Sequence, residues 1–143
     1  MDTTQDSPKI IPAIAVAFSA LVAYAVVFFL AMVVIAALFL LFSKIPILSS
    51  LLGIFFAFRG DTPVALTVIL STVLSYEAAA FTSSRFTTSP KTAALSRILS
   101  GVFLLALNGI FLVVNISSGS AFFSNAANAI SGIVMIVKGK ESL

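Results

Sequence analysis

The sequence predicts an all-α integral membrane protein: a four-helix bundle with a short additional helix that is interfacial or re-entrant. Of the 143 residues, 60% are hydrophobic and only 9% are charged, and the mean hydropathy is +1.19. The eight basic and five acidic residues are concentrated between four long apolar stretches. Because a charge at the centre of a bilayer costs about 3 kcal/mol on insertion scales, this distribution indicates membrane spans. At this length we expect a single membrane domain, residues 1–143.

The first apolar run, residues 10–42, is predicted to form one long helix. It contains no charge, and no Gly or Pro interrupts it after Pro12. At about 1.5 Å per residue such a helix extends roughly 50 Å, which exceeds a bilayer core of about 30 Å but is too short for two crossings and a turn. We therefore expect a tilted or projecting helix that faces lipid or another subunit. We also expect it to stay in place, because a cleavable signal peptide has a basic start and a shorter apolar region.

The next apolar segment, residues 46–58, is too short to cross the bilayer as a helix. Pro46 suits the first turn of a helix, and Pro63 follows the segment. We predict a short non-crossing helix on the outer face. The alternative is an additional crossing through a thinned bilayer.

The second span is predicted at residues 63–82, with Pro63 in its first turn. One face of this helix carries small or weakly polar side chains, which is typical of a helix contact. These are Thr67, Ser71, Ser75, Ala78 and Thr82. A polar connection is expected from Thr82 to Arg97, interrupted by Pro90. The third and fourth spans are predicted at residues 98–116 and 121–137, joined by a turn rich in Ser and Gly.

The basic residues predict the orientation. With four crossings, one side of the membrane receives Lys9, Arg85, Lys91, Arg97, Lys138 and Lys140, whereas the other side receives Lys44 and Arg59. The positive-inside rule then places both termini in the cytoplasm. We expect the cations beside the spans to contact lipid headgroups, namely Arg85, Lys91, Arg97, Lys138 and Lys140.

Glu77 is the only acidic residue within a predicted span. An intramembrane carboxylate is a candidate functional group. Three roles are open: a site for an ion or proton, a structural pair with a basic residue such as Lys138, or exposure at the interface beside Tyr76.

The last two spans carry asparagines in helical register. Asn108 and Asn115 lie seven residues apart, and Asn125 and Asn128 share a face of the following helix. Because buried amides seek each other in lipid, we expect Asn108 to contact Asn128 and to hold the two helices together, with Gly109 at the same depth. The same residues could instead line a polar pore or substrate groove.

The chain contains no Cys, His or Trp. This excludes disulfides, thiolate or imidazole metal sites, and catalysis by Cys or His. We expect no catalytic residue, no cofactor, no metal and no nucleic-acid partner. The expected partners are membrane lipids and either other membrane subunits or further copies of the chain. We predict a non-catalytic accessory or scaffold subunit of a larger membrane complex; the alternative is a small oligomeric transporter or channel that uses Glu77 and the Asn108/Asn128 pair.

Overall fold

The computed structural model describes residues 7–47, 50, 62–87, 89–114 and 119–143. These residues form four helices: α1 (Ile10–Ser43), α3 (Thr62–Arg85), α4 (Pro90–Val114) and α5 (Gly119–Glu141). All four contain a stretch that is long and apolar enough to cross a membrane. The predicted all-α class with four long apolar helices is therefore confirmed. Most of the predicted short helix, residues 46–58, lies outside the described residues, and so does Asn115.

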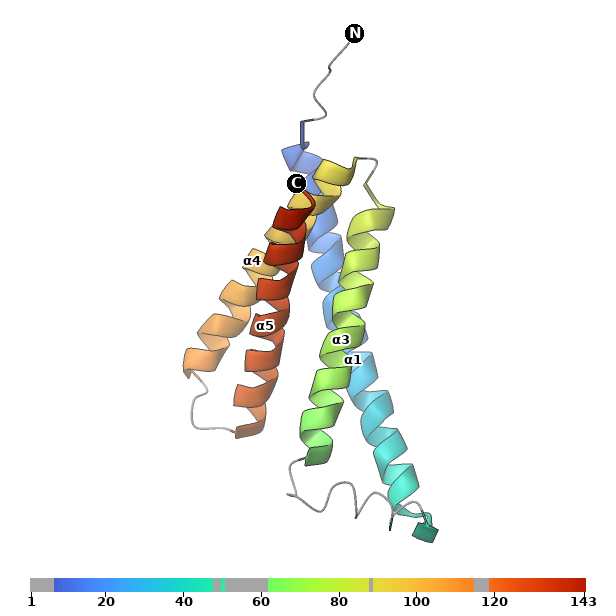
Figure 1. Cartoon of the computed structure of the whole chain (residues 1–143). Coiled ribbons are helices and arrows are strands. Elements are labelled where there is room, and N and C mark those ends of the chain that lie inside the picture. Colours follow the sequence, from blue (N-terminus) through green and yellow to red (C-terminus); the bar gives the residue numbers. More distant parts are fainter. Residues whose placement is uncertain (1–6, 48–49, 51–61, 88, 115–118) are drawn as a thin grey trace.

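The helices are arranged as two pairs. α4 packs along α5, α1 packs along α3, and further contacts of α1 with α4 and of α3 with α5 join the pairs. The start of α1, the end of α5 and the connection between α3 and α4 lie at the same end of the bundle, which we call the terminal end (Figure 1). From this terminal end the two pairs diverge toward the opposite end.

The connection between α3 and α4 is shorter than the sequence predicts. α3 continues to Arg85 and α4 already begins at Pro90, whereas the prediction was a polar connection from Thr82 to Arg97. The helices extend beyond their apolar stretches, and hydroxyl groups there bond to the helix backbone: Thr82 Oγ1 donates to the Ala78 carbonyl at 2.8 Å. Pro90 starts a helix here instead of breaking one, since a first-turn residue needs no backbone N–H.

The bundle interior contains mainly small side chains. Five of these side chains are completely buried: Ala13 and Ala20 of α1, Ser71 and Ser75 of α3, and Ser96 of α4. Side chains of this size let the helix backbones come close together. Ser75 satisfies its hydroxyl within its own helix by donating to the Ser71 carbonyl, so that it needs no partner across the interface. The predicted contact face of α3 is confirmed for Thr67, Ser71, Ser75 and Thr82, but Ala79 takes the buried position in place of Ala78.

Helix α1 has two different halves. Its first half has a buried face that includes Ala13, Val16, Ala17, Ala20 and Tyr24, so the expectation that this span faces lipid or another subunit does not hold for that face. In its second half Ala31 is the last buried residue, and none of the side chains at 32–43 is buried. That half diverges from the other helices (Figure 1), and its contact with lipid or another subunit stays a prediction.

Candidate functional site

Helices α4 and α5 meet backbone to backbone at glycines. A Cβ atom added to Gly101 would lie 2.5 Å from the Gly132 carbonyl oxygen, and one added to Gly132 would lie 2.7 Å from the Gly101 carbonyl oxygen. A Cβ atom on Gly139 would similarly lie 2.8 Å from a carbonyl oxygen of α4. These positions leave no room for a larger residue. Gly109, which the sequence placed at the depth of Asn128, has no atom of another described segment within 4 Å of its Cβ position and takes no part in this contact.

A buried hydrogen bond joins the two helix pairs. The Tyr24 hydroxyl of α1 donates to Asn128 Oδ1 of α5 at 2.6 Å. Tyr24 is only 4% exposed and Asn128 only 7%. The Phe28 ring stacks on the Tyr24 ring, with centroids 6.4 Å apart and planes inclined by 9°. Hydrogen bonds of this kind between spans contribute about 0.6 to 1.7 kcal/mol.

Two further hydroxyl groups are close to the Tyr24 hydroxyl. They belong to Thr72 of α3 and Ser131 of α5. Thr72 Oγ1 donates to the Val68 carbonyl at 2.8 Å. Ser131 Oγ is buried and has no hydrogen-bond partner among the described residues. We refer to Tyr24, Thr72, Asn128 and Ser131 as the central polar cluster; it brings three of the four helices to one point.

Asn108 and Asn128 do not form the hydrogen bond that the sequence predicts. Asn108 is buried, but its Nδ2 donates to the Leu104 carbonyl of its own helix at 2.9 Å. The Asn128 oxygen is instead occupied by Tyr24. The hairpin of α4 and α5 therefore depends on its glycines, and Asn128 connects α5 to α1.

The asparagines share the wall of a pocket between α1, α4 and α5. This pocket has a volume of about 310 Å³, and Asn108, Asn125 and Asn128 line it together with Phe28 and Phe29. The predicted grouping of these three amides is therefore present in the structure, although they surround a space instead of bonding directly.

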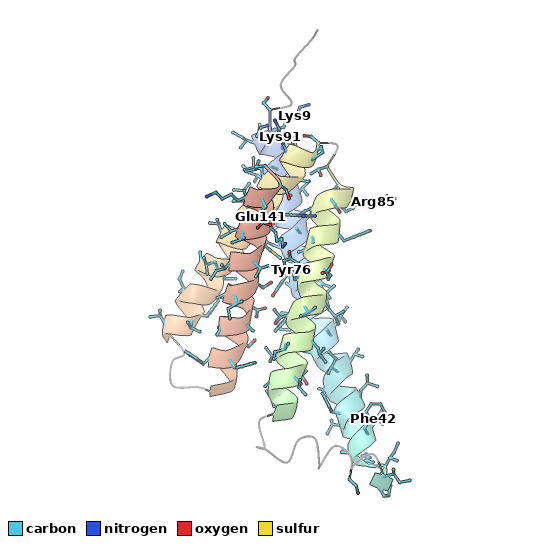
Figure 2. The ribbon with its side chains drawn as sticks, viewed as in Figure 1. Lys9, Phe42, Tyr76, Arg85, Lys91 and Glu141 are labelled. Carbon is cyan, nitrogen blue, oxygen red and sulfur yellow. The ribbon has the colours of Figure 1, made fainter. Side chains whose placement is uncertain are left out.

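Glu77 lies apart from these residues. Its side chain is exposed on the outside of the bundle and forms no ion pair within the described part of the chain. It does not line the pocket that contains the three amides. Lys138, the basic partner suggested from the sequence, lies 3.6 Å from Glu141 instead. The neighbouring Tyr76 lies along the length of α3, away from both helix ends (Figure 2).

The predicted headgroup cations gather at the terminal end. Figure 2 shows Arg85 and Lys91 at this end, together with Lys9 and Glu141. Arg85, Lys138 and Lys140 are exposed, whereas Lys91 and Arg97 are partly buried. The Nε atom of Arg97 is buried and has no hydrogen-bond partner in the described residues.

The sequence analysis did not identify Tyr24 as a functional or structural residue. A signal was present: Ala13, Ala17, Ala20 and Tyr24 recur at intervals of three and four residues, and Tyr24 is the most polar ring in a run of aliphatic side chains and phenylalanines. That spacing places the alanines and the tyrosine on one face of a helix. A polar side chain on such a face in a membrane span requires a hydrogen-bond partner.

The glycine contacts and the central polar cluster can hold helices together and fix their orientation. The amide-lined pocket can accept a polar group. Covalent or acid–base catalysis would require a nucleophile beside an oriented base. The described residues contain no such pair. Comparison with protein-family models, with curated protein sequences and with solved structures finds no match for this chain.

Proposed function

We propose that this protein is a non-catalytic subunit of a larger membrane assembly and that it binds its partner through the face of α3 that carries Glu77. The observation that carries the proposal is the position of this carboxylate. Glu77 is exposed on the outside of the bundle, in a helix long enough to span a membrane, without an ion pair in the described residues. Charged residues within membrane spans almost always face the interior of a bundle or a water-filled cavity.

The surroundings of Glu77 support this reading. On the same face of α3, Leu74 and Phe81 are 50% and 66% exposed, so an apolar stripe extends on both sides of the carboxylate. Glu77 also precedes the end of α3 at Arg85 by more than two helical turns, or about 12 Å. Exposure of a carboxylate to lipid at such a depth is unfavourable by up to about 3 kcal/mol. A basic or hydrogen-bonding side chain from a second membrane helix would offset that cost, and the apolar stripe would pack against the same helix.

The arrangement gives less support to the alternative function, a small transporter or channel. That function requires Glu77 and the amides to border one path. Glu77 projects outward from α3, whereas the pocket with Asn108 and Asn128 lies between α1, α4 and α5. The proposed orientation, with both termini in the cytoplasm, rests on the basic residues at the terminal end.

The experiment that tests the proposal is purification of the full chain from its native membrane in mild detergent, followed by quantification of the chains that co-purify. The comparison is between wild type, Glu77→Gln and Glu77→Leu. The matched control is Glu141→Gln, which removes an exposed carboxylate that already pairs with Lys138 at the end of α5. We expect both changes at Glu77 to reduce the recovery of a stoichiometric partner about tenfold, which corresponds to about 1.4 kcal/mol. The control should retain the partner.

Equal recovery of the partner with all variants would overturn the proposal. So would a cation or proton flux through proteoliposomes that contain only this chain, if Glu77→Gln abolished that flux while the protein remained folded.

A further inference from the structure

The terminal end of the bundle contains a second pocket, separate from the amide-lined one. It has a volume of about 360 Å³, which is within the range of about 300 to 1,000 Å³ that ligand pockets occupy. The pocket is surrounded by residues from four places: the C-terminal part of α3, the connection that follows it, the first turns of α4 and the C-terminus of the chain. Its polar lining consists of Ser84, Thr87, Ser89, Arg97 and Ser142.

Arg97 is the one charged side chain among the described residues that line this pocket. Its side chain also borders a small cavity that is lined by Ala79 and Ser83 of α3 and Met135 of α5, so it extends between these helices. Its Nε atom is buried without a hydrogen-bond partner in the described part of the chain. A guanidinium retains its charge under all ordinary conditions, and a charge that is partly removed from water is stabilised by a paired anion.

The described residues supply no anion for Arg97. None of the described residues that line the pocket is acidic. Glu141 lies 3.6 Å from Lys138, and Glu77 forms no ion pair in this part of the chain. The surrounding hydroxyls supply no charge either. Three of them donate to backbone carbonyls: Ser84 to Phe81 at 2.9 Å, Thr87 to Ser83 at 2.7 Å and Ser142 to Lys138 at 2.9 Å.

We propose that this pocket binds a phosphate group through Arg97. Phosphate offers paired oxygens that match the two parallel N–H groups of a guanidinium, and a charge-assisted contact of this kind is about twice as strong as a neutral hydrogen bond. The hydroxyls around the pocket can rotate from a backbone carbonyl toward the phosphate oxygens. Lys9, Arg85 and Lys91 at the same end of the bundle raise the local concentration of anions (Figure 2).

The phosphate can belong to a lipid headgroup or to a free anion, because both present the same oxygens. To distinguish them, the delipidated full chain in a non-ionic detergent is titrated with phosphatidylglycerol, with phosphatidylcholine and, separately, with inorganic phosphate. Bound lipid is counted by native mass spectrometry, and thermal stability is followed in parallel at constant ionic strength.

The variants separate the pocket from general attraction to positive charge. Arg97→Gln removes the charge inside the pocket, and Arg85→Gln removes a charge at the same end from an exposed side chain that does not line it. Ser142→Asp adds a negative charge at the pocket from an exposed position, so it tests the site even if Arg97→Gln fails to fold. We expect Arg97→Gln and Ser142→Asp to weaken phosphatidylglycerol binding about tenfold, as the loss of a charge-assisted contact implies. Arg85→Gln should change it far less.

Preference for phosphatidylglycerol without any effect of inorganic phosphate would assign the site to a lipid headgroup. Stabilisation by inorganic phosphate that Arg97→Gln removes would assign it to a free anion. Both results support the proposal. Equal losses with Arg97→Gln and Arg85→Gln, or the absence of any response to phosphatidylglycerol and phosphate in the wild type, would overturn it.

Discussion

The contact between Gly101 and Gly132 provides the sharpest test of how this bundle is held together. In Gly132→Ala, the new methyl group would lie 2.7 Å from the Gly101 carbonyl oxygen and 2.8 Å from the Leu105 backbone nitrogen. Ordinary contacts begin near 3.4 Å, so α5 would have to move away from α4 by about 0.7 Å. The obstructing atoms belong to the backbone and cannot rotate aside. Overpacking of this kind destabilises a protein by about 1 to 3 kcal/mol.

Gly109→Ala is the matched control. Both substitutions replace a glycine within a helix by alanine, and both therefore gain about 1 kcal/mol of helix propensity. Gly109 has no atom of another described segment within 4 Å of its Cβ position, so this variant has no opposing steric cost. The difference between the two variants isolates the helix contact. We expect Gly132→Ala to be less stable than Gly109→Ala by about 1 to 3 kcal/mol.

The measurement is unfolding in mixed micelles by increasing dodecyl sulfate, followed by energy transfer between dyes on cysteines introduced at Lys91 and Lys140. The chain has no native Cys that would interfere. Both labelled positions lie near the terminal end, on α4 and α5, so that their separation reports the opening of this hairpin. Equal free energies of unfolding for the two glycine variants would refute the conclusion that α4 and α5 meet at Gly132.

Three further predictions concern hydrogen bonding and orientation. Tyr24→Phe removes the donor to Asn128, and we expect a loss of about 0.6 to 1.7 kcal/mol in the same unfolding assay. Because Asn108 bonds to its own helix, Asn108→Leu and Asn128→Leu should have additive effects to within about 0.5 kcal/mol, measured by a double-mutant cycle. Single cysteines at Ser89 and Ser118 should react with an impermeant thiol reagent from opposite sides of the membrane, with Ser89 on the cytoplasmic side.

Each of these three predictions has a control variant or an outcome that would contradict it. Tyr76→Phe removes the other tyrosine hydroxyl of the chain, which forms no hydrogen bond to Asn128, and should leave stability nearly unchanged. An interaction energy above about 1 kcal/mol between Asn108 and Asn128 would mean that the two amides do contact each other. Labelling of Ser89 and Ser118 from the same side would exclude a two-span hairpin formed by α4 and α5.

The sequence by itself determined how many long helices form and where they lie along the chain. Apolar length and the cost of placing a charge in lipid are properties of a continuous stretch of residues, and neither depends on neighbouring helices. The first helix was therefore predicted to within one residue at its C-terminal end, 10–42 against Ile10–Ser43. The helix ends near the α3–α4 connection were less accurate, because Ser and Thr at 82–97 are compatible with either a loop or a helix whose hydroxyls bond to its backbone.

Only the tertiary structure decided which helix faces meet and which residues lie at the same depth along the helix axes. Spacing of three and four residues assigns side chains to a face of one helix, but the axial shift between two helices depends on how their surfaces pack. For this reason the sequence placed Asn108 and Gly109 at the depth of Asn128, whereas Asn128 accepts a hydrogen bond from Tyr24 and the close approach of the two backbones is at Gly101 and Gly132. The pairing of Tyr24 with Asn128 links residues that are 104 positions apart, and it exists because the small side chains of α1 let that helix approach the other pair at this depth.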